Sequence, residues 1–242
     1  MSYINPSNFK FASLTVEMVP EDIHVEVIRS ISVSDDGTIW MGTSGLGLTS
    51  YNPTDGTLAS YRSDPNTKNT LSGNRVVSLF HDKKDKLWIG TQQSGINIMY
   101  PSGKILQLKG FPATTIWFIQ PTATGDTLMV GTRNEGLILC DLSGNVIAQF
   151  ISTNYEGMTD NNLRAIASVD GINYIVGTEE KGIFRFNIIE NSFTRIEVPL
   201  SLNEIKSLYV KEQELWIGTA KNGIGIYNLI DQTYEILNSS DG

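Results

Sequence analysis

Short apolar runs alternate with polar, glycine-containing turns along most of the chain. The runs are rich in β-branched and aromatic residues, and Gly, Asp, Asn and Ser separate them, which is the pattern of β-strands joined by tight turns. In one representative segment we expect strands over residues 76–80, 86–91, 96–100 and 104–108. Because the connections between them are so short, the strands can only form an antiparallel meander.

An apolar triplet followed by Gly-Thr recurs five times, and a second glycine stands five residues after the first in every copy. The first glycines are Gly42, Gly90, Gly131, Gly177 and Gly218. The second glycines are Gly47, Gly95, Gly136, Gly182 and Gly223. The steps between the first glycines are 48, 41, 46 and 41 residues. A period of this length indicates a repeat architecture.

The repeated glycines and tryptophans have a structural interpretation. We expect the first glycine to end the second strand where a side chain would collide with the adjoining sheet, and the second glycine to need a positive φ or a close approach. Tryptophans recur at one phase of the repeat, at Trp40, Trp88 and Trp216. We interpret them as packing between sheets and not as ligand contacts.

The predicted fold is all-β, a β-propeller of four-stranded antiparallel blades, because each small sheet has two apolar faces and needs a neighbour on both. The blades are expected at about 27–61, 76–108, 116–150, 163–196 and 205–237, with an unpaired outer strand within residues 1–25. Seven blades at this period would need about 308 residues. We therefore interpret the 242 residues as part of a seven-bladed propeller, with a closed five-bladed ring as the alternative.

Composition narrows the classes of partner. The net charge of −8 argues against nucleic acid and anionic lipid, and no apolar run approaches the length of a membrane span. Residues 1–10 lack the features of a signal peptide. Cys140 alone predicts a buried apolar side chain, and His24 and His81 lack a second ligand at metal-site spacing, so we expect no metal and no cofactor.

The repeat Asp-x-x-Gly-x-Ile/Leu-Trp-Ile-Gly-Thr-x-x-x-Gly-Leu resembles the two-component regulator propeller repeat over residues 27–237. Met129 and Ile175 depart from it by replacing tryptophan. The resemblance implies a periplasmic, non-enzymatic sensor region of a hybrid two-component protein, in a family that typically carries two seven-bladed propellers. It also implies recognition of a glycan fragment, with the remaining blades and a histidine kinase in the parent chain, and self-association as a further possibility.

Ligand contacts are expected on the propeller face where two kinds of loop emerge, those between the second and third strands and those that lead into each blade. The first kind carries Gln92, Gln93, Arg133, Asn134, Glu135, Glu179, Lys181, Lys221 and Asn222. The second kind carries Asn74, Tyr155, Asn161 and Asn162.

A second candidate set shares one register, the second residue of each innermost strand, near the channel mouth. Its members are Arg29, Val77, Trp117, Arg164 and Lys206. Three cations and a tryptophan in one register could hold an anionic or uronic saccharide. The preferred alternative is that carboxylates of neighbouring blades neutralise the cations.

No catalytic residue is assigned from the sequence. Glu135, Glu179 and Glu180 lie in equivalent loops and could form a glycosidase-like carboxylate pair, but we favour solvated loop charges. The leading hypothesis is the sensor module. A propeller enzyme acting on glycans or lactones and a protein-interaction scaffold are the alternatives.

Overall fold

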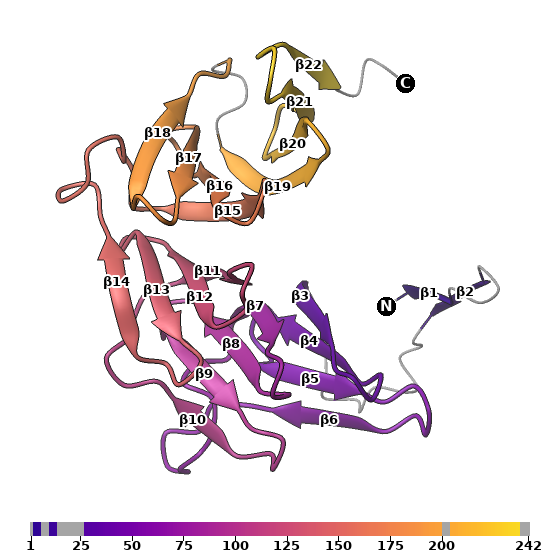
Figure 1. Ribbon diagram of the computed structural model, residues 1–242. Helices are drawn as coiled ribbons and strands as arrows, with labels where there is room; N and C mark the ends of the chain where they lie inside the picture. Colours follow the sequence, from indigo (N-terminus) through magenta and orange to yellow (C-terminus); the bar gives the residue numbers. More distant parts are fainter. Residues whose placement is uncertain (1, 6–9, 14–26, 200–203, 238–242) are drawn as a thin grey trace.

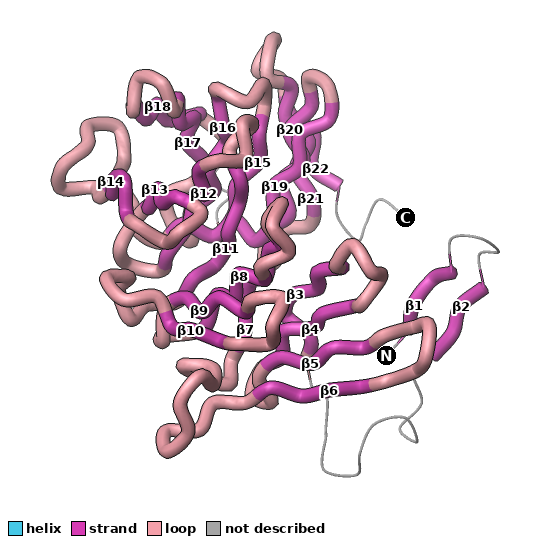
Figure 2. The backbone as a smooth tube through the Cα atoms, turned by 60° about the horizontal axis from the view of Figure 1, so that its bottom comes forward, coloured by secondary structure: helices cyan, strands magenta, loops and turns pink. Residues whose placement is uncertain are grey.

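The structure is a computed structural model, and it describes residues 2–5, 10–13, 27–199 and 204–237. Within these ranges the chain consists of strands and loops, as Figure 2 shows. No helix in the described part of the chain has the length and apolar character needed to span a bilayer.

Five four-stranded antiparallel sheets follow one another along the chain (Figure 1). The first two contain β3 (Ile28–Val33), β4 (Ile39–Thr43), β5 (Leu48–Tyr51) and β6 (Leu58–Tyr61), then β7 (Val76–His81), β8 (Leu87–Thr91), β9 (Ile96–Met99) and β10 (Ile105–Gln107). The third contains β11 (Ile116–Pro121), β12 (Thr127–Thr132), β13 (Leu137–Asp141) and β14 (Val146–Phe150). The last two contain β15 (Leu163–Ser168), β16 (Asn173–Thr178), β17 (Ile183–Asn187) and β18 (Ser192–Ile196), then β19 (Ile205–Lys211), β20 (Glu214–Thr219), β21 (Ile224–Asn228) and β22 (Tyr234–Leu237). The predicted all-β architecture of meander blades is confirmed.

The N-terminal segment differs from the expectation of an unpaired outer strand. Strand β2 (Lys10–Ser13) pairs antiparallel with β1 (Ser2–Asn5), so the two form a separate two-stranded sheet. Pairing with β1 satisfies the backbone groups on one edge of β2, which a solitary strand would leave without partners. The rest of the predicted strand, residues 9 and 14, lies outside the described residues.

The core consists of four apolar layers, one between each pair of consecutive sheets. Leu48, Val76 and Ile89 lie in the layer between the first and second sheets. The next layers follow in chain order around Trp88, Phe150 and Ile217. The inner strands β3, β7, β11, β15 and β19 contact one another in this order and lie toward the centre of Figure 1, with the outer strands at the periphery. Burial between neighbouring sheets is therefore the main source of stability.

The first and fifth sheets each present an uncovered face. Ile31 is 56% exposed, whereas the side chains at its repeat position, Leu79, Ile119, Ile166 and Leu208, pack into the four layers. On the fifth sheet Tyr209 and Tyr234 are 63% and 56% exposed. A closed five-bladed ring would bury these side chains against one another. In the described residues these three side chains remain exposed instead.

The second glycine has its predicted role in all five sheets, and the first glycine approaches the next sheet at Gly42, Gly90 and Gly177, whereas a Cβ at Gly131 or Gly218 would meet Phe118 or Ser207 of its own sheet. A Cβ at Gly90 would lie 2.8 Å from Ile116 of the next sheet, and one at Gly177 would lie 2.5 Å from Ile205. All five second glycines have positive φ angles, between 68° at Gly136 and 86° at Gly182. The first position therefore needs glycine for space and the second for backbone conformation.

The threonine of each Gly-Thr pair has a role that the sequence analysis did not assign. Its hydroxyl donates to the carbonyl of the second glycine in all five sheets, at 2.7 Å for Thr91 and 3.0 Å for Thr178. In four sheets the same oxygen also accepts a backbone N–H of the turn, as Thr178 does from Lys181. The side chain therefore fixes the loop between the second and third strands of each sheet.

Candidate ligand-binding site

A β-bulge occurs at the same place in every inner strand. In β15, Leu163 pairs with Thr178 and Ala165 with Gly177, so Arg164 between them has no partner in the ladder. The same register shift skips Arg29, Val77, Trp117 and Lys206. The set that the sequence placed in one register is thus the set of bulge residues. These five positions are therefore equivalent. A bulge changes the direction of the side chain and interrupts strand pairing, so the residue at each of them does not have to fit a partner residue on the second strand.

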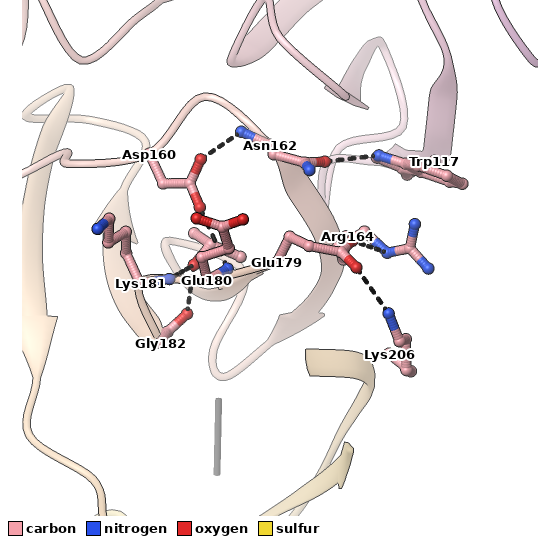
Figure 3. Close-up of polar contacts among 10 residues, drawn as sticks. Trp117, Asp160, Asn162, Arg164, Glu179, Glu180, Lys181, Gly182 and Lys206 are labelled. Carbon is pink, nitrogen blue, oxygen red and sulfur yellow. Dashed lines mark hydrogen bonds and ion pairs between the residues drawn. The ribbon is translucent and has the colours of Figure 1, made fainter. Parts of the chain in front are cut away.

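Side chains from three consecutive sheets meet at this register, as Figure 3 shows. The Arg164 guanidinium carbon lies 3.7 Å from the centroid of the Trp117 ring, and Arg164 Nε lies 2.9 Å from Glu179 Oε2. Lys206 Nζ, from the fifth sheet, lies 2.8 Å from Glu179 Oε1. Trp117 Nε1 donates to Asn162 Oδ1 at 2.8 Å. We call these five residues, Trp117, Asn162, Arg164, Glu179 and Lys206, the bulge cluster.

The bulge cluster is partly buried and rich in positive charge. The side chains of Arg164, Glu179 and Lys206 are 19%, 27% and 35% exposed. Burial lowers the pKa of the Arg164 guanidinium, Glu179 raises it, and the nearby Arg29 and Arg133 lower it further. Arg29 and Arg133 thus lie close enough to act on Arg164, and Glu179 contacts both Arg164 and Lys206. An arginine remains protonated in this setting, so the cluster keeps a surplus of positive charge.

The preferred alternative, neutralisation of the cations by carboxylates of neighbouring blades, holds in part. Glu179 pairs with Lys206 across the junction of the fourth and fifth sheets, but it also pairs with Arg164 of its own sheet. Arg29 donates from Nε to Ser44 Oγ at 2.7 Å, which leaves its charge without a carboxylate contact among the described residues. The expectation that Glu179 is a solvated loop charge is wrong, since both of its oxygens contact cations.

Several other candidates have local partners instead. Gln149 Nε2 donates to Glu135 Oε2 at 3.2 Å, and Lys221 Nζ pairs with Glu204 Oε1 at 3.1 Å. The remaining loop candidates make backbone hydrogen bonds that shape the loops or are exposed. They are Gln92, Gln93, Arg133, Asn134, Lys181 and Asn222.

Three residues named on the loops before the blades have structural contacts. Asn74 Oδ1 accepts the Ser63 backbone N–H at 2.7 Å, and Asn161 Oδ1 accepts that of Ser152 at the same distance. The Tyr155 ring lies 4.6 Å from that of Phe150 and packs against the core. These side chains hold the connections between blades, a role that a polar loop pattern does not reveal.

The glutamates considered as a carboxylate pair occupy different environments. Glu135 accepts from Gln149, Glu179 contacts two cations, and Glu180 is exposed. Glu179 could take a proton from a substrate only by giving up an ion pair. Among the described residues no group of three or more His, Cys, Asp and Glu side chains is placed to hold a metal ion.

Comparison with known proteins agrees with the repeat. The family model of the two component regulator propeller matches residues 70–93. Histidine kinase P4 of Formosa agariphila is 40% identical over 65 residues, which are 27% of this chain and 5% of that protein. The chain thus spans only a small part of that relative.

Solved structures share the fold. The extracellular domain of a proposed hybrid two-component system of B. thetaiotaomicron matches with a TM-score of 0.76 and 20% identity, over 91% of this chain and 29% of that one. The extracellular domain of a proposed one-component system of that organism matches with 0.75 and 20%, over 93% and 32%. Virginiamycin B lyase of Staphylococcus aureus matches with 0.71 and 16%, over 98% and 76%. At these identities the likeness shows the fold alone.

The family match and the Gly-Thr register point to the same repeat. Residues 70–93 end in the second Gly-Thr pair and the loop that follows it, the part of the repeat on which the resemblance was based. Residues 70–93 thus match the two component regulator propeller repeat, in agreement with the resemblance indicated by the sequence.

Proposed function

We propose that this chain is a non-enzymatic, ligand-sensing propeller module of a hybrid two-component signalling protein. The family match and the extracellular domains that share the fold support this role. In this proposal the module lies outside the cytoplasm, and a histidine kinase elsewhere in the parent protein receives the signal.

The ligand class that the bulge cluster fits best is an acidic oligosaccharide. The observation that carries this proposal is one carboxylate, Glu179, in contact with both Arg164 and Lys206 while Arg29 and Arg133 lie close enough to affect Arg164. A ligand carboxylate would satisfy this surplus charge through charge-assisted hydrogen bonds, and the half-buried Trp117 indole beside it offers an apolar surface to a sugar ring.

Two matched ligands test the charge requirement in titration calorimetry. Trigalacturonate is expected to bind and the neutral galactotriose of the same linkage to bind much more weakly. Arg164→Ala should weaken trigalacturonate binding by at least about tenfold, because hydrogen bonds to charged groups contribute roughly 1.5–3 kcal/mol. Equal affinity for the two sugars would contradict the proposal.

Lys221→Ala is the control for the loss of one positive charge. Lys221 is 75% exposed and pairs with Glu204 outside the bulge cluster, so its removal should leave trigalacturonate affinity unchanged. Arg29→Ala should weaken binding with little loss of stability, because Arg29 makes one exposed side-chain hydrogen bond among the described residues. Stability is measured in parallel, since Arg164 also stacks on Trp117 and its removal is expected to lower the melting temperature.

A propeller enzyme is the second candidate function. The observation in its favour is the fold that this chain shares with virginiamycin B lyase. Chromatography of the sugar after prolonged incubation distinguishes the two. A thermal shift without new products supports a sensor, whereas shortened or unsaturated products would establish an enzyme.

A further inference from the structure

A cavity of about 210 Å³ lies between the first and second sheets. Trp40 and Tyr61 of the first sheet line it, and His81, Leu87 and Met99 of the second sheet line it from the other side. The Trp40 ring centroid lies 5.7 Å from that of Tyr61 and 6.3 Å from that of His81. The cavity is smaller than the ~300–1,000 Å³ of drug-sized pockets, so it suits a small molecule.

The next junction shows why the cavity exists. At the corresponding place between the second and third sheets, Lys86 reaches across and donates from Nζ to the Leu142 carbonyl at 2.9 Å. The first sheet has Thr38 in the repeat position of Lys86, and Pro101, which lines the cavity, is the counterpart of Leu142. A threonine is too short to cross the junction. The space that the Lys86 side chain fills between the second and third sheets is therefore open between the first and second sheets.

The tryptophans of the two repeats differ in the same way. Trp88 is fully buried and donates from Nε1 to Asp82 Oδ2 at 3.0 Å. The counterpart of Asp82 in the first sheet is Ser34, whose hydroxyl donates to Asp36. Trp40 Nε1 has no hydrogen-bond partner within the described part of the chain. Trp40 is thus held by packing alone and lies at the cavity wall instead of inside a sealed layer.

Negative charge surrounds the cavity. The Asp36 and Asp85 carboxylates belong to residues that line it, and Asp35 and Asp82 lie close enough to act with them on His81. At the repeat positions of Asp35 and Asp36 the second sheet carries Lys83 and Lys84. Lys83 and Lys86 of this turn reach toward the third sheet, where their Nζ atoms donate to the Thr124 and Leu142 carbonyls, and Lys86 Nζ lies 5.6 Å from the centroid of the Tyr100 ring. The cavity therefore favours a cation, whereas the bulge cluster favours an anion.

We propose that this cavity between the first and second sheets binds a small organic cation with an ammonium group. Aromatic rings attract such a cation through their electron-rich faces, and the surrounding carboxylates add Coulombic attraction. The Lys86 ammonium beside Tyr100 shows a cation in this kind of setting one junction away. The proposal is independent of the proposed function, because it uses different residues and the opposite charge.

Choline and its neutral isostere 3,3-dimethylbutan-1-ol test the proposal on the intact chain by nitrogen-resolved NMR of the tryptophan indoles. Trp40→Phe assigns the Trp40 resonance. Choline is expected to shift this resonance with millimolar affinity and to leave that of Trp117 in place, and the isostere is expected to bind at least about fivefold more weakly. Equal shifts with both compounds, or none with choline, would overturn the proposal.

Two variants locate the ligand. Asp36→Asn should weaken choline binding by about fivefold, the effect of one contact-distance charge in water. Thr38→Lys should abolish it by placing in the cavity the side chain that the second sheet carries. Asp55→Asn, an exposed carboxylate in the turn between β5 and β6 and outside the cavity, should have no effect. Unchanged choline binding in Thr38→Lys would contradict the assignment of the cavity as the site.

Discussion

Replacing Glu179 by glutamine should lower stability and raise affinity for acidic sugars. The substitution removes the carboxylate that contacts both Arg164 and Lys206. Exposed ion pairs contribute ~0.2–1 kcal/mol each, and these two are partly buried, so each lies near the upper end. Glutamine can still accept one hydrogen bond, which leaves an expected loss of about 1–2 kcal/mol. For a domain of this size the melting temperature should fall by about 2–8 °C.

The affinity change follows from competition. In the native protein a ligand carboxylate must share Arg164 and Lys206 with Glu179, whereas in Glu179→Gln both cations are available. Trigalacturonate should therefore bind more tightly to the variant although the variant is less stable. A residue that only maintains the structure would lower stability without raising affinity, so the opposite signs of the two changes are the diagnostic result.

Calorimetric melting and trigalacturonate titration of Glu179→Gln and Glu180→Gln provide the comparison. Glu180 is the adjacent residue, carries the same charge and is exposed, so it controls for the change in net charge. In about 1 M salt, where the Debye length is ~3 Å, the stability difference between the variants should shrink. Equal destabilisation by the two variants, or a weaker affinity in Glu179→Gln, would refute the reasoning.

Three further predictions concern single residues. Gly90→Ala should destabilise the protein by about 1–3 kcal/mol in urea unfolding, because the added Cβ meets Ile116 of the next sheet, and an unchanged midpoint would contradict this role. Burial lowers the pKa of His81 despite the surrounding aspartates, so stability should fall as pH decreases through the unfolded-state value of about 6.5. A His81→Gln variant should lose less stability over that interval, and parallel pH profiles would exclude His81 as the cause. Burial raises the pKa of the Cys140 thiol to about 12, so iodoacetamide should modify it only after unfolding, and rapid modification of the native protein would contradict its placement.

The sequence predicted the fold because every repeated signal in it concerns packing between neighbours. The glycine register alone located the loops between second and third strands, and the bulge residues followed from counting along each inner strand. The partners of those residues could not be predicted in the same way. Whether Glu179 contacts Lys206 depends on how the fourth and fifth sheets are juxtaposed, and no local pattern encodes that relation.

Three residues that were expected on a ligand-facing loop make structural contacts, and the reason is the same for each. Asn74, Asn161 and Tyr155 have the composition expected of a ligand-facing loop, but their side chains satisfy backbone groups or fill the core. Polar loop residues are often needed in this way, because the connection between two blades has backbone N–H groups that no strand pairs with. The amino-acid composition of a loop does not show whether its side chains contact a ligand or support the loop itself.

In a repeat of this kind, ligand binding is expected at the positions where the fold constrains the side chain least. The Gly-Thr pair is constrained, since a Cβ at the glycine would meet the next sheet or the inner strand of its own sheet, and the threonine fixes the loop. The bulge residue is outside the hydrogen-bonded ladder, and the five sheets place Arg29, Val77, Trp117, Arg164 and Lys206 there. The position before the second strand is similarly free, with Thr38 in one sheet and Lys86 in the next. Both proposed sites arise at such positions, where the same backbone tolerates different charges and sizes and the identity of the side chain alone sets what can bind.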